Sequence, residues 1–118
     1  MRIRADFTFC ASHQLHWHQG HCRNLHGHNY QLQVCVAGKP DPATGVVMDF
    51  YDLERVVREK VLSAVDHRHL NDLLANPTAE EILRFCWRRL RPDLPGLDTL
   101  VLWETPTCSA EYRGEDEP

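Results

Sequence analysis

The stretch "CRNLHGHNY", residues 22–30, places a histidine on each side of one glycine and a cysteine four residues before the first of them. His26 and His28 stand at the start of a strand-like segment, where residues i and i+2 point the same way, about 6.5 Å apart. Two imidazoles at that spacing can bind one metal ion at about 2.1 Å each. A His-X-His pair alone is weak evidence, so a third ligand is needed.

His13 supplies the third ligand. It ends an alternating segment, residues 3–13, on the same parity as the apolar residues. If this segment pairs antiparallel with residues 28–36, His13 comes close to His26 and His28. Three histidines with an open fourth position are typical of catalytic zinc. An iron site of the cupin type would need a glutamate about four residues after the second histidine, where the chain has Leu32. We therefore predict zinc.

Cys22 lies in the loop before the histidine pair and has wholly polar neighbours, "HQGHCRN". A thiol beside zinc and imidazoles ionises readily, so a thiolate would be present near neutral pH. Cys22 could then act as a base, as a nucleophile or as a fourth zinc ligand. The alternative, a small buried hydrophobic residue, describes Cys10, Cys35 and Cys86 better.

Asp66 and His67 follow a helix-like segment as adjacent residues. A carboxylate that orients an imidazole is the usual support for a histidine acting as general acid or base. Adjacent side chains in one extended segment do not pair easily, however. Taken alone, the two residues are described better as a helix-terminal histidine and a turn aspartate.

Glu104 ends the strand-like segment 99–105 and shares its parity with Leu100 and Leu102. A carboxylate that points into an apolar sheet face needs hydrogen-bond donors. A heterocycle edge with two adjacent N–H groups would satisfy both carboxylate oxygens. An exposed glutamate at a strand end is an equally weighted alternative.

The composition excludes several classes of protein. A chain of 118 residues forms a single domain, residues 1–118, and we expect 114–118 to be a frayed acidic tail. The net charge of −4 provides no basic field for nucleic acid. No apolar run approaches the roughly 20 residues of a membrane span, and the N-terminus lacks the apolar core of a signal peptide. Five cysteines without a Cys-X-X-Cys pair argue against a disulfide framework, so we expect a cytoplasmic protein.

The hydrophobic pattern changes from a period of two to a helical period and back. It predicts two helices, one N-capped by Asp49 and one opened by a Thr78–Glu81 capping box. The expected order is β-β-β-α-α-β-β. The fold class is therefore α+β, an antiparallel sheet with two helices packed on one face. The expected elements are strands 3–13, 28–36 and 46–50, helices 50–65 and 78–90, and strands 99–105 and 110–114.

Six sequence blocks resemble, in order, those of the 6-pyruvoyl-tetrahydropterin synthase / 6-carboxy-tetrahydropterin synthase family. The resemblance runs from about Phe7 to Gly114, nearly the whole chain, and the departures are conservative, such as Val65 where leucine is commoner. The blocks are "FTFCASH", "CRNLHGHNY", "TGVVMDF", "VDHRHLN", "NPTAEE" and "WETPT".

This resemblance implies the tunnelling fold (T-fold), in which trimers close their sheets into a barrel and two trimers stack as a homohexamer. It also implies active sites between subunits and a small-molecule pterin triphosphate substrate. By position, the zinc ligands (one Zn²⁺ per chain) match His13, His26 and His28. Catalytic residues from neighbouring chains match Cys22, Asp66 and His67, and the pterin-binding residue matches Glu104.

The spacing between Cys22 and His26 resembles that of one branch of the family. The animal pyruvoyl synthases resemble Cys-x5-His-Gly-His, and the bacterial 6-carboxy-tetrahydropterin synthases of queuosine biosynthesis resemble Cys-x3-His-Gly-His, the spacing found here. The implied reaction is that of a lyase: it converts 7,8-dihydroneopterin triphosphate and water to 6-carboxy-5,6,7,8-tetrahydropterin, acetaldehyde and triphosphate. Two alternatives stay open: pyruvoyl synthase activity on the same substrate, and a non-catalytic zinc-binding module.

Overall fold

Two long antiparallel strands, β1 (Arg2–His13) and β2 (His26–Ala37), form the centre of the sheet in the computed structural model, which describes residues 1–118. β4 (Leu97–Thr105) pairs antiparallel with β2, and β5 (Cys108–Tyr112) pairs antiparallel with β4. The two-residue strand β3 (Arg68–His69) lies parallel to the end of β1. The sheet order is therefore β3-β1-β2-β4-β5.

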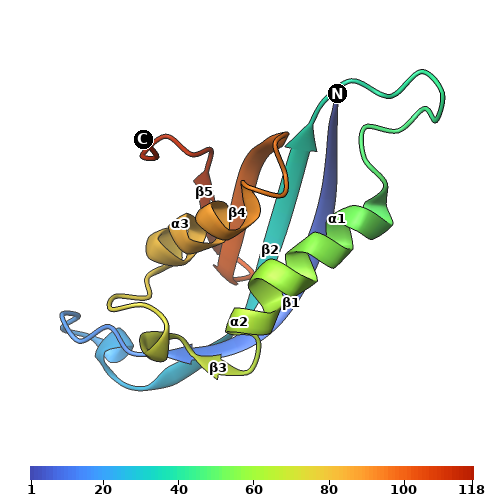
Figure 1. Ribbon diagram of the computed structural model, residues 1–118. Helices are drawn as coiled ribbons and strands as arrows, with labels where there is room; N and C mark the ends of the chain where they lie inside the picture. Colours follow the sequence, from blue (N-terminus) through green and yellow to red (C-terminus); the bar gives the residue numbers. More distant parts are fainter.

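The helices lie together on one face of this sheet, as Figure 1 shows. α1 (Phe50–Val57) continues through a π-helical segment, Arg58–Leu62, into the short α2 (Ser63–Val65). Its N-cap is Asp49, whose side chain accepts a hydrogen bond from the backbone N–H of Tyr51. The α+β class with two helical segments on one face is confirmed.

The second long helix, α3 (Ala79–Leu90), begins where the sequence predicts it. The Thr78 side chain accepts a hydrogen bond from the backbone N–H of Glu81, 3.2 Å away. Glu81 does not complete the capping box, because its carboxylate pairs with Arg84 instead. Position and N-cap of this helix are confirmed.

The core fills the space between the helices and the sheet. Alternate residues of the strands face inward, and one stripe of each helix packs on them, as the two periods predict. The side chains that are almost fully buried include Phe9, Tyr30, Leu32, Leu53, Ile82, Leu83, Leu100 and Leu102. His13 is the only polar residue that is buried with them.

The strand predicted at residues 46–50 is wrong. The backbone of this region forms a local turn instead, in which Asp41 N–H donates to Val46 O and Gly45 N–H donates to Asp41 O. Val47 and Met48 still pack against the core, which explains their apolar character without a strand. The additional strand is β3, within a segment that the periodicity left unassigned.

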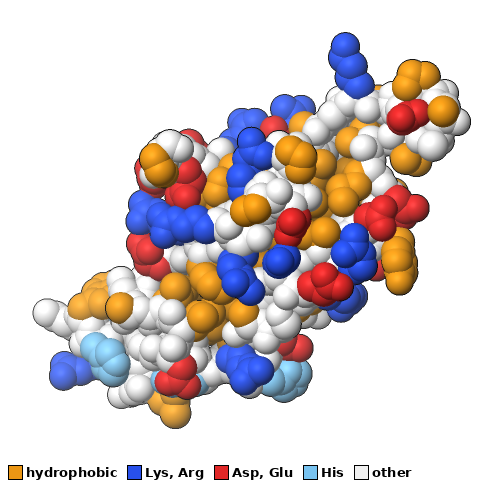
Figure 2. Space-filling model, viewed as in Figure 1, with side chains coloured by type: hydrophobic (Ala, Val, Ile, Leu, Met, Phe, Trp, Pro, Cys, Tyr) orange, Lys and Arg blue, Asp and Glu red, His pale blue; other side chains and the backbone are white.

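The loop between β1 and β2 contains a short 3-10 helix, η1 (His21–Arg23), and projects from one end of the sheet (Figure 1). Figure 2 shows exposed histidine side chains, in pale blue, near this end of the molecule. At the C-terminus, Asp116 and Glu117 lie against Arg84 and Arg88 of α3, and the fraying of this tail stays a prediction. None of the helices has the length and apolar character that crossing a membrane requires.

Candidate metal centre

His13 and His26 lie directly opposite each other in the β1–β2 ladder, and His28 follows on the same face of β2. The Nε2 atoms of His13 and His26 are 2.9 Å apart. The three rings meet edge to face, with centroids 4.5 to 5.1 Å apart. The strands thus bring the three histidines to one point, as the parity of both segments predicts.

Backbone carbonyl groups fix two of these rings, those of His13 and His26, through their Nδ1 atoms. The Nδ1 atom of His13 is 2.8 Å from the carbonyl oxygen of Pro77, and that of His26 is 2.7 Å from the carbonyl oxygen of Asn24. A carbonyl oxygen only accepts hydrogen bonds, so each Nδ1 carries the proton. Both Nε2 atoms are then left as donors of an electron pair, the state that binds metal.

Glu104 joins the histidines from β4. The β2–β4 register sets Leu32 opposite Leu102, which brings the end of β4 beside the histidines of β2. The Oε1 atom of Glu104 lies 2.9 Å from Nε2 of His28 and 3.3 Å from Nε2 of His13. Of the two alternatives that the sequence leaves open for Glu104, the structure supports the inward-facing one. The contact of Glu104 with the histidines was not among the predictions.

The donor set fits a divalent metal ion. One ligand atom from each of the four side chains lies within 4.8 Å of all the others. Four donors arranged tetrahedrally at about 2.1 Å from zinc would be about 3.4 Å apart. His28 Nε2 is buried and has no partner in hydrogen-bond geometry, although the Glu104 carboxylate is close to it. Such an arrangement suits two ligands of one ion better than a donor–acceptor pair.

The electrostatics of the cluster couple Glu104 to the histidines. The bond to His13 holds the pKa of Glu104 below its ordinary value, although burial acts in the opposite direction. Burial lowers the pKa of His13, but the Glu104 carboxylate and the Pro77 carbonyl outweigh it, so that the net shift is upward. Burial also lowers the pKa of His28, and for this ring it dominates. Protons and a cation therefore compete for the same atom, Nε2 of His13.

Asp66 and His67 form a second polar group, at the edge of the sheet beside β1. His67 Nδ1 lies 3.0 Å from Asp66 Oδ1. The expectation that adjacent side chains cannot easily pair is wrong here, because His67 has a φ of +58° and the chain turns sharply between the two residues. Cys10 fixes this turn, since its N–H donates to Asp66 Oδ1 and its carbonyl accepts from His67 N–H.

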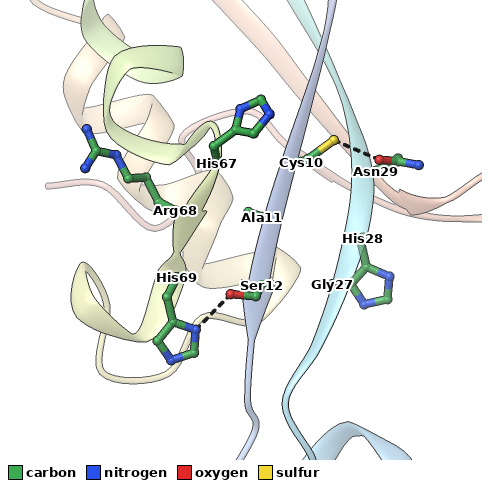
Figure 3. A pocket seen from close by; sticks show the side chains of 9 residues that line it. All are labelled: Cys10, Ala11, Ser12, Gly27, His28, Asn29, His67, Arg68 and His69. Carbon is green, nitrogen blue, oxygen red and sulfur yellow. Dashed lines mark hydrogen bonds between the residues drawn. The ribbon is translucent and has the colours of Figure 1, made fainter.

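An open hollow of 490 Å³ lies beside this turn, as Figure 3 shows. His67, Arg68 and His69 border it on one side of β1, and Gly27, His28 and Asn29 border it on the other side. The side chain of His67 is 80% exposed, so the Asp66–His67 pair faces this open space rather than the core.

Cys22 lies in η1, half-buried, and its side chain makes no hydrogen bond. It is not one of the four clustered donors, and no side-chain hydrogen bond joins it to Asp66 or His67. Within a single chain, Cys22 therefore makes no polar contact with the histidine cluster or with the Asp66–His67 pair. Cys35 and Cys86 are buried as predicted, but the same prediction for Cys10 is wrong, because Cys10 is exposed on the helix-free face of the sheet.

This sheet, its helices and the convergent histidines define a known class. The chain belongs to the 6-pyruvoyl tetrahydropterin synthase family, whose model matches residues 2–115. The structure of 6-pyruvoyl tetrahydropterin synthase from Caenorhabditis elegans is similar, with a TM-score of 0.89 and 27% identity over 98% of this chain and 96% of that chain. The membership predicted from the six sequence blocks is confirmed.

Two curated relatives narrow the comparison. The chain is 36% identical to the 6-carboxy-5,6,7,8-tetrahydropterin synthase of Haemophilus influenzae over an alignment of 138 positions, gaps included, which covers 95% of this chain and 98% of the relative. It is 45% identical over 109 residues to the dihydroneopterin monophosphate aldolase of Pyrococcus furiosus, covering 87% and 89%. Both relatives are named for reactions of pterins.

Proposed function

We propose that this protein is a lyase that converts 7,8-dihydroneopterin triphosphate and water to 6-carboxy-5,6,7,8-tetrahydropterin, acetaldehyde and triphosphate. The observation that carries the proposal is the convergence of three histidine nitrogens next to the carboxylate of Glu104. Such a site offers a metal ion for the oxygens of a substrate side chain and a bidentate acceptor for the N–H edge of a pterin ring. The likeness to the Haemophilus influenzae enzyme supports this choice within the family.

Zinc is the proposed metal, one ion per chain, with His13, His26 and His28 as its ligands. The neutral imidazole donors and the fixed Nδ1 protons of His13 and His26 support this assignment. When bound, zinc supplies Lewis-acid polarisation of the oxygens on the substrate side chain. Glu104 is proposed to fix the pterin ring.

Two residues are proposed to move protons at the side-chain carbons next to the ring, and a third orients one of them. Cys22 acts as the base, and His67, oriented by Asp66, acts as the complementary acid or base. The 3.0 Å contact between Asp66 and His67 supports their joint role. Arg23 and Arg68 are candidates to bind the triphosphate, because both are exposed and neither has an ion-pair partner within the chain.

A homohexamer, built as a dimer of trimers, is the proposed assembly. β3 covers the outer edge of β1 only at Ala11 and Ser12. Because backbone groups alternate in direction along a strand, the outward groups between Arg4 and Thr8 have no partner within the chain. β5 leaves the opposite edge of the sheet open. Strand edges of this kind can pair between copies, which supports the proposed assembly, in which Cys22 of one chain acts together with Asp66 and His67 of another.

The proposed pathway is queuosine (7-deazaguanine) biosynthesis, which the family branch with the Cys-x3-His-Gly-His spacing implies. The proposed location is the cytoplasm. All five cysteines are unpaired, which fits a protein in a reducing compartment.

An aldolase is the second candidate, because the Pyrococcus furiosus relative has the higher identity of the two. A retro-aldol reaction would break the bond between the first two side-chain carbons and leave a hydroxymethyl pterin and a two-carbon aldehyde. Pyruvoyl synthase activity would leave a dicarbonyl side chain on the ring and release no aldehyde. A non-catalytic zinc module would change no pterin at all.

Product analysis tests these alternatives in one experiment. The zinc-loaded protein is incubated with 7,8-dihydroneopterin triphosphate, and with the monophosphate in parallel, and the pterins and aldehydes are identified by mass. The expected products are the 6-carboxy pterin and acetaldehyde in equal amounts. A hydroxymethyl pterin, a dicarbonyl pterin or unchanged substrate would each reject the proposal in favour of a named alternative.

A further inference from the structure

The carboxylate of Glu104 lies where a fourth ligand would complete a tetrahedral metal site with the three histidines. Its Oε1 atom is 2.9 Å from His28 Nε2 and 3.3 Å from His13 Nε2, distances similar to that between the two facing nitrogens of His13 and His26. A tetrahedral zinc ion accepts carboxylate oxygen as readily as imidazole nitrogen, at about 2.0 to 2.2 Å. The four side chains are therefore sufficient for a closed site.

The thiol does not compete for this position within the chain. Cys22 lies outside the group of donors that approach within 4.8 Å of one another. It belongs to η1 in the β1–β2 loop, whereas Glu104 is fixed in register at the end of β4. Cys22 and Glu104 are the two residues that could complete the zinc site, and only Glu104 is positioned beside the histidines by its strand.

We infer that Glu104 is the fourth metal ligand in the substrate-free protein, and that it exchanges this position for the pterin ring when substrate binds. The second half of this inference rests on the proposed function, in which the same carboxylate holds the ring. Metal coordination and ring recognition thus compete for the Glu104 carboxylate. While Glu104 is bound to the metal ion, it prevents other ligands from binding there, and a bound pterin would release it.

The attachment of Glu104 permits such an exchange. His13 is fully buried and is bound from behind by the carbonyl of Pro77. The Glu104 side chain is 27% exposed, and the polar contacts of its carboxylate are those to His13 and His28. A ligand without a supporting hydrogen bond is the easiest to displace.

The inference is tested with Co²⁺ in place of zinc, because the visible absorption of Co²⁺ reports its ligands directly. Wild type, Glu104→Gln and Cys22→Ala proteins are compared, with Glu54→Gln as the matched control for loss of an exposed carboxylate on α1. We expect Glu104→Gln to change the Co²⁺ spectrum and to weaken metal binding by at least about tenfold. We expect Cys22→Ala and Glu54→Gln to leave both unchanged.

A second measurement uses the wild-type protein alone and so does not depend on the folding of a variant. X-ray absorption at the zinc edge should show only nitrogen and oxygen ligands near 2.0 to 2.2 Å, and a sulfur ligand near 2.3 Å would overturn the inference. A Glu104→Gln spectrum identical to wild type would also overturn it. Addition of dihydroneopterin, without phosphates, should change the wild-type Co²⁺ spectrum, and an unchanged spectrum would reject the exchange.

These readouts separate the two proposals. The spectra report metal ligands whether or not any pterin is turned over. If the spectrum depends on Glu104 and product analysis finds unchanged substrate, the ligand assignment stands and the proposed function fails. If the 6-carboxy pterin forms and the spectrum is independent of Glu104, only the ligand assignment fails.

Discussion

His13 and His26 face each other across β1 and β2 with their Nε2 atoms 2.9 Å apart, while backbone carbonyls hold both Nδ1 atoms. Two unprotonated nitrogens at this distance repel each other unless a proton or a cation lies between them. The fold therefore preorganises the metal site: it holds two lone pairs close together before the ion arrives.

The first prediction is that His26→Ala removes most of the bound zinc and all activity. The substitution leaves two histidines and Glu104, and it removes the nitrogen that faces His13. Metal content by elemental analysis of the purified protein is the measurement, with His18→Ala in the adjoining loop as the control. Stoichiometric zinc and normal turnover in His26→Ala would place the metal elsewhere.

The second prediction concerns pH. The ion needs the unprotonated Nε2 of His13, whose pKa is raised above its ordinary value of 6.5. Protons therefore compete with the metal as pH falls, and zinc affinity should decrease from neutral pH downward, by about tenfold per pH unit for each proton displaced. Competition with a chromophoric chelator between about pH 5 and 8, where histidine titrates, measures it. Affinity independent of pH over this range would contradict the assigned ligands.

The third prediction tests whether active sites lie between chains. Cys22→Ala and His67→Ala proteins should each be inactive, and mixed oligomers of the two should regain part of the activity. The reason is that, in the proposed assembly, one chain provides Cys22 and another provides the Asp66–His67 pair, so that some mixed sites receive both intact residues. Mixing after partial dissociation, with each variant alone as the control, is the experiment. Sedimentation that finds only active monomer would exclude the assembly.

The fourth prediction concerns thiol reactivity. Cys35 and Cys86 are buried, and burial raises the pKa of the Cys86 thiol to about 12, so neither should react with iodoacetamide in the folded protein. Cys22 should react first near neutral pH when zinc is bound. Cys10 and Cys108 are exposed and should follow. Mass mapping of the alkylated peptides over time measures this order, and alkylation of Cys86 before Cys22 would contradict it.

The sequence predicts the histidine cluster well because strand parity determines which side chains share a face. His13 and His28 lie on the apolar parity of two long strands, and a wrong register would have moved them to the other face. β3 could not be predicted in this way, because two residues carry no period, and the turn before it depends on the left-handed backbone of His67. The exposure of Cys10 also depends on which sheet face the helices cover, a property of the tertiary fold.

Glu104 also shows which features strand parity predicts and which depend on the tertiary fold. Its inward direction follows from the parity of Leu100 and Leu102, which the sequence displays. Its contact with His28 depends on the β2–β4 register, which joins residues that are far apart in the chain. Local patterns determine the direction of a side chain, whereas its partner is determined by long-range pairing that one sequence does not display.

The last prediction separates the two possible roles of Cys22, the proton-moving base and the zinc ligand. If Cys22 is the base, Cys22→Ala should keep stoichiometric zinc, because His13, His26 and His28 remain. Turnover should fall by about 10² to 10⁴, the range typical of losing a general acid or base. If Cys22 is instead a structural ligand, the same change should loosen zinc markedly, because the site would lose its only thiolate.

Zinc content and rate, measured on the same preparation, distinguish the two roles, and Cys108→Ala is the control for loss of an exposed thiol. Turnover close to wild type in Cys22→Ala would exclude a catalytic role, and the spacing between Cys22 and His26 would then reflect only the length of a loop.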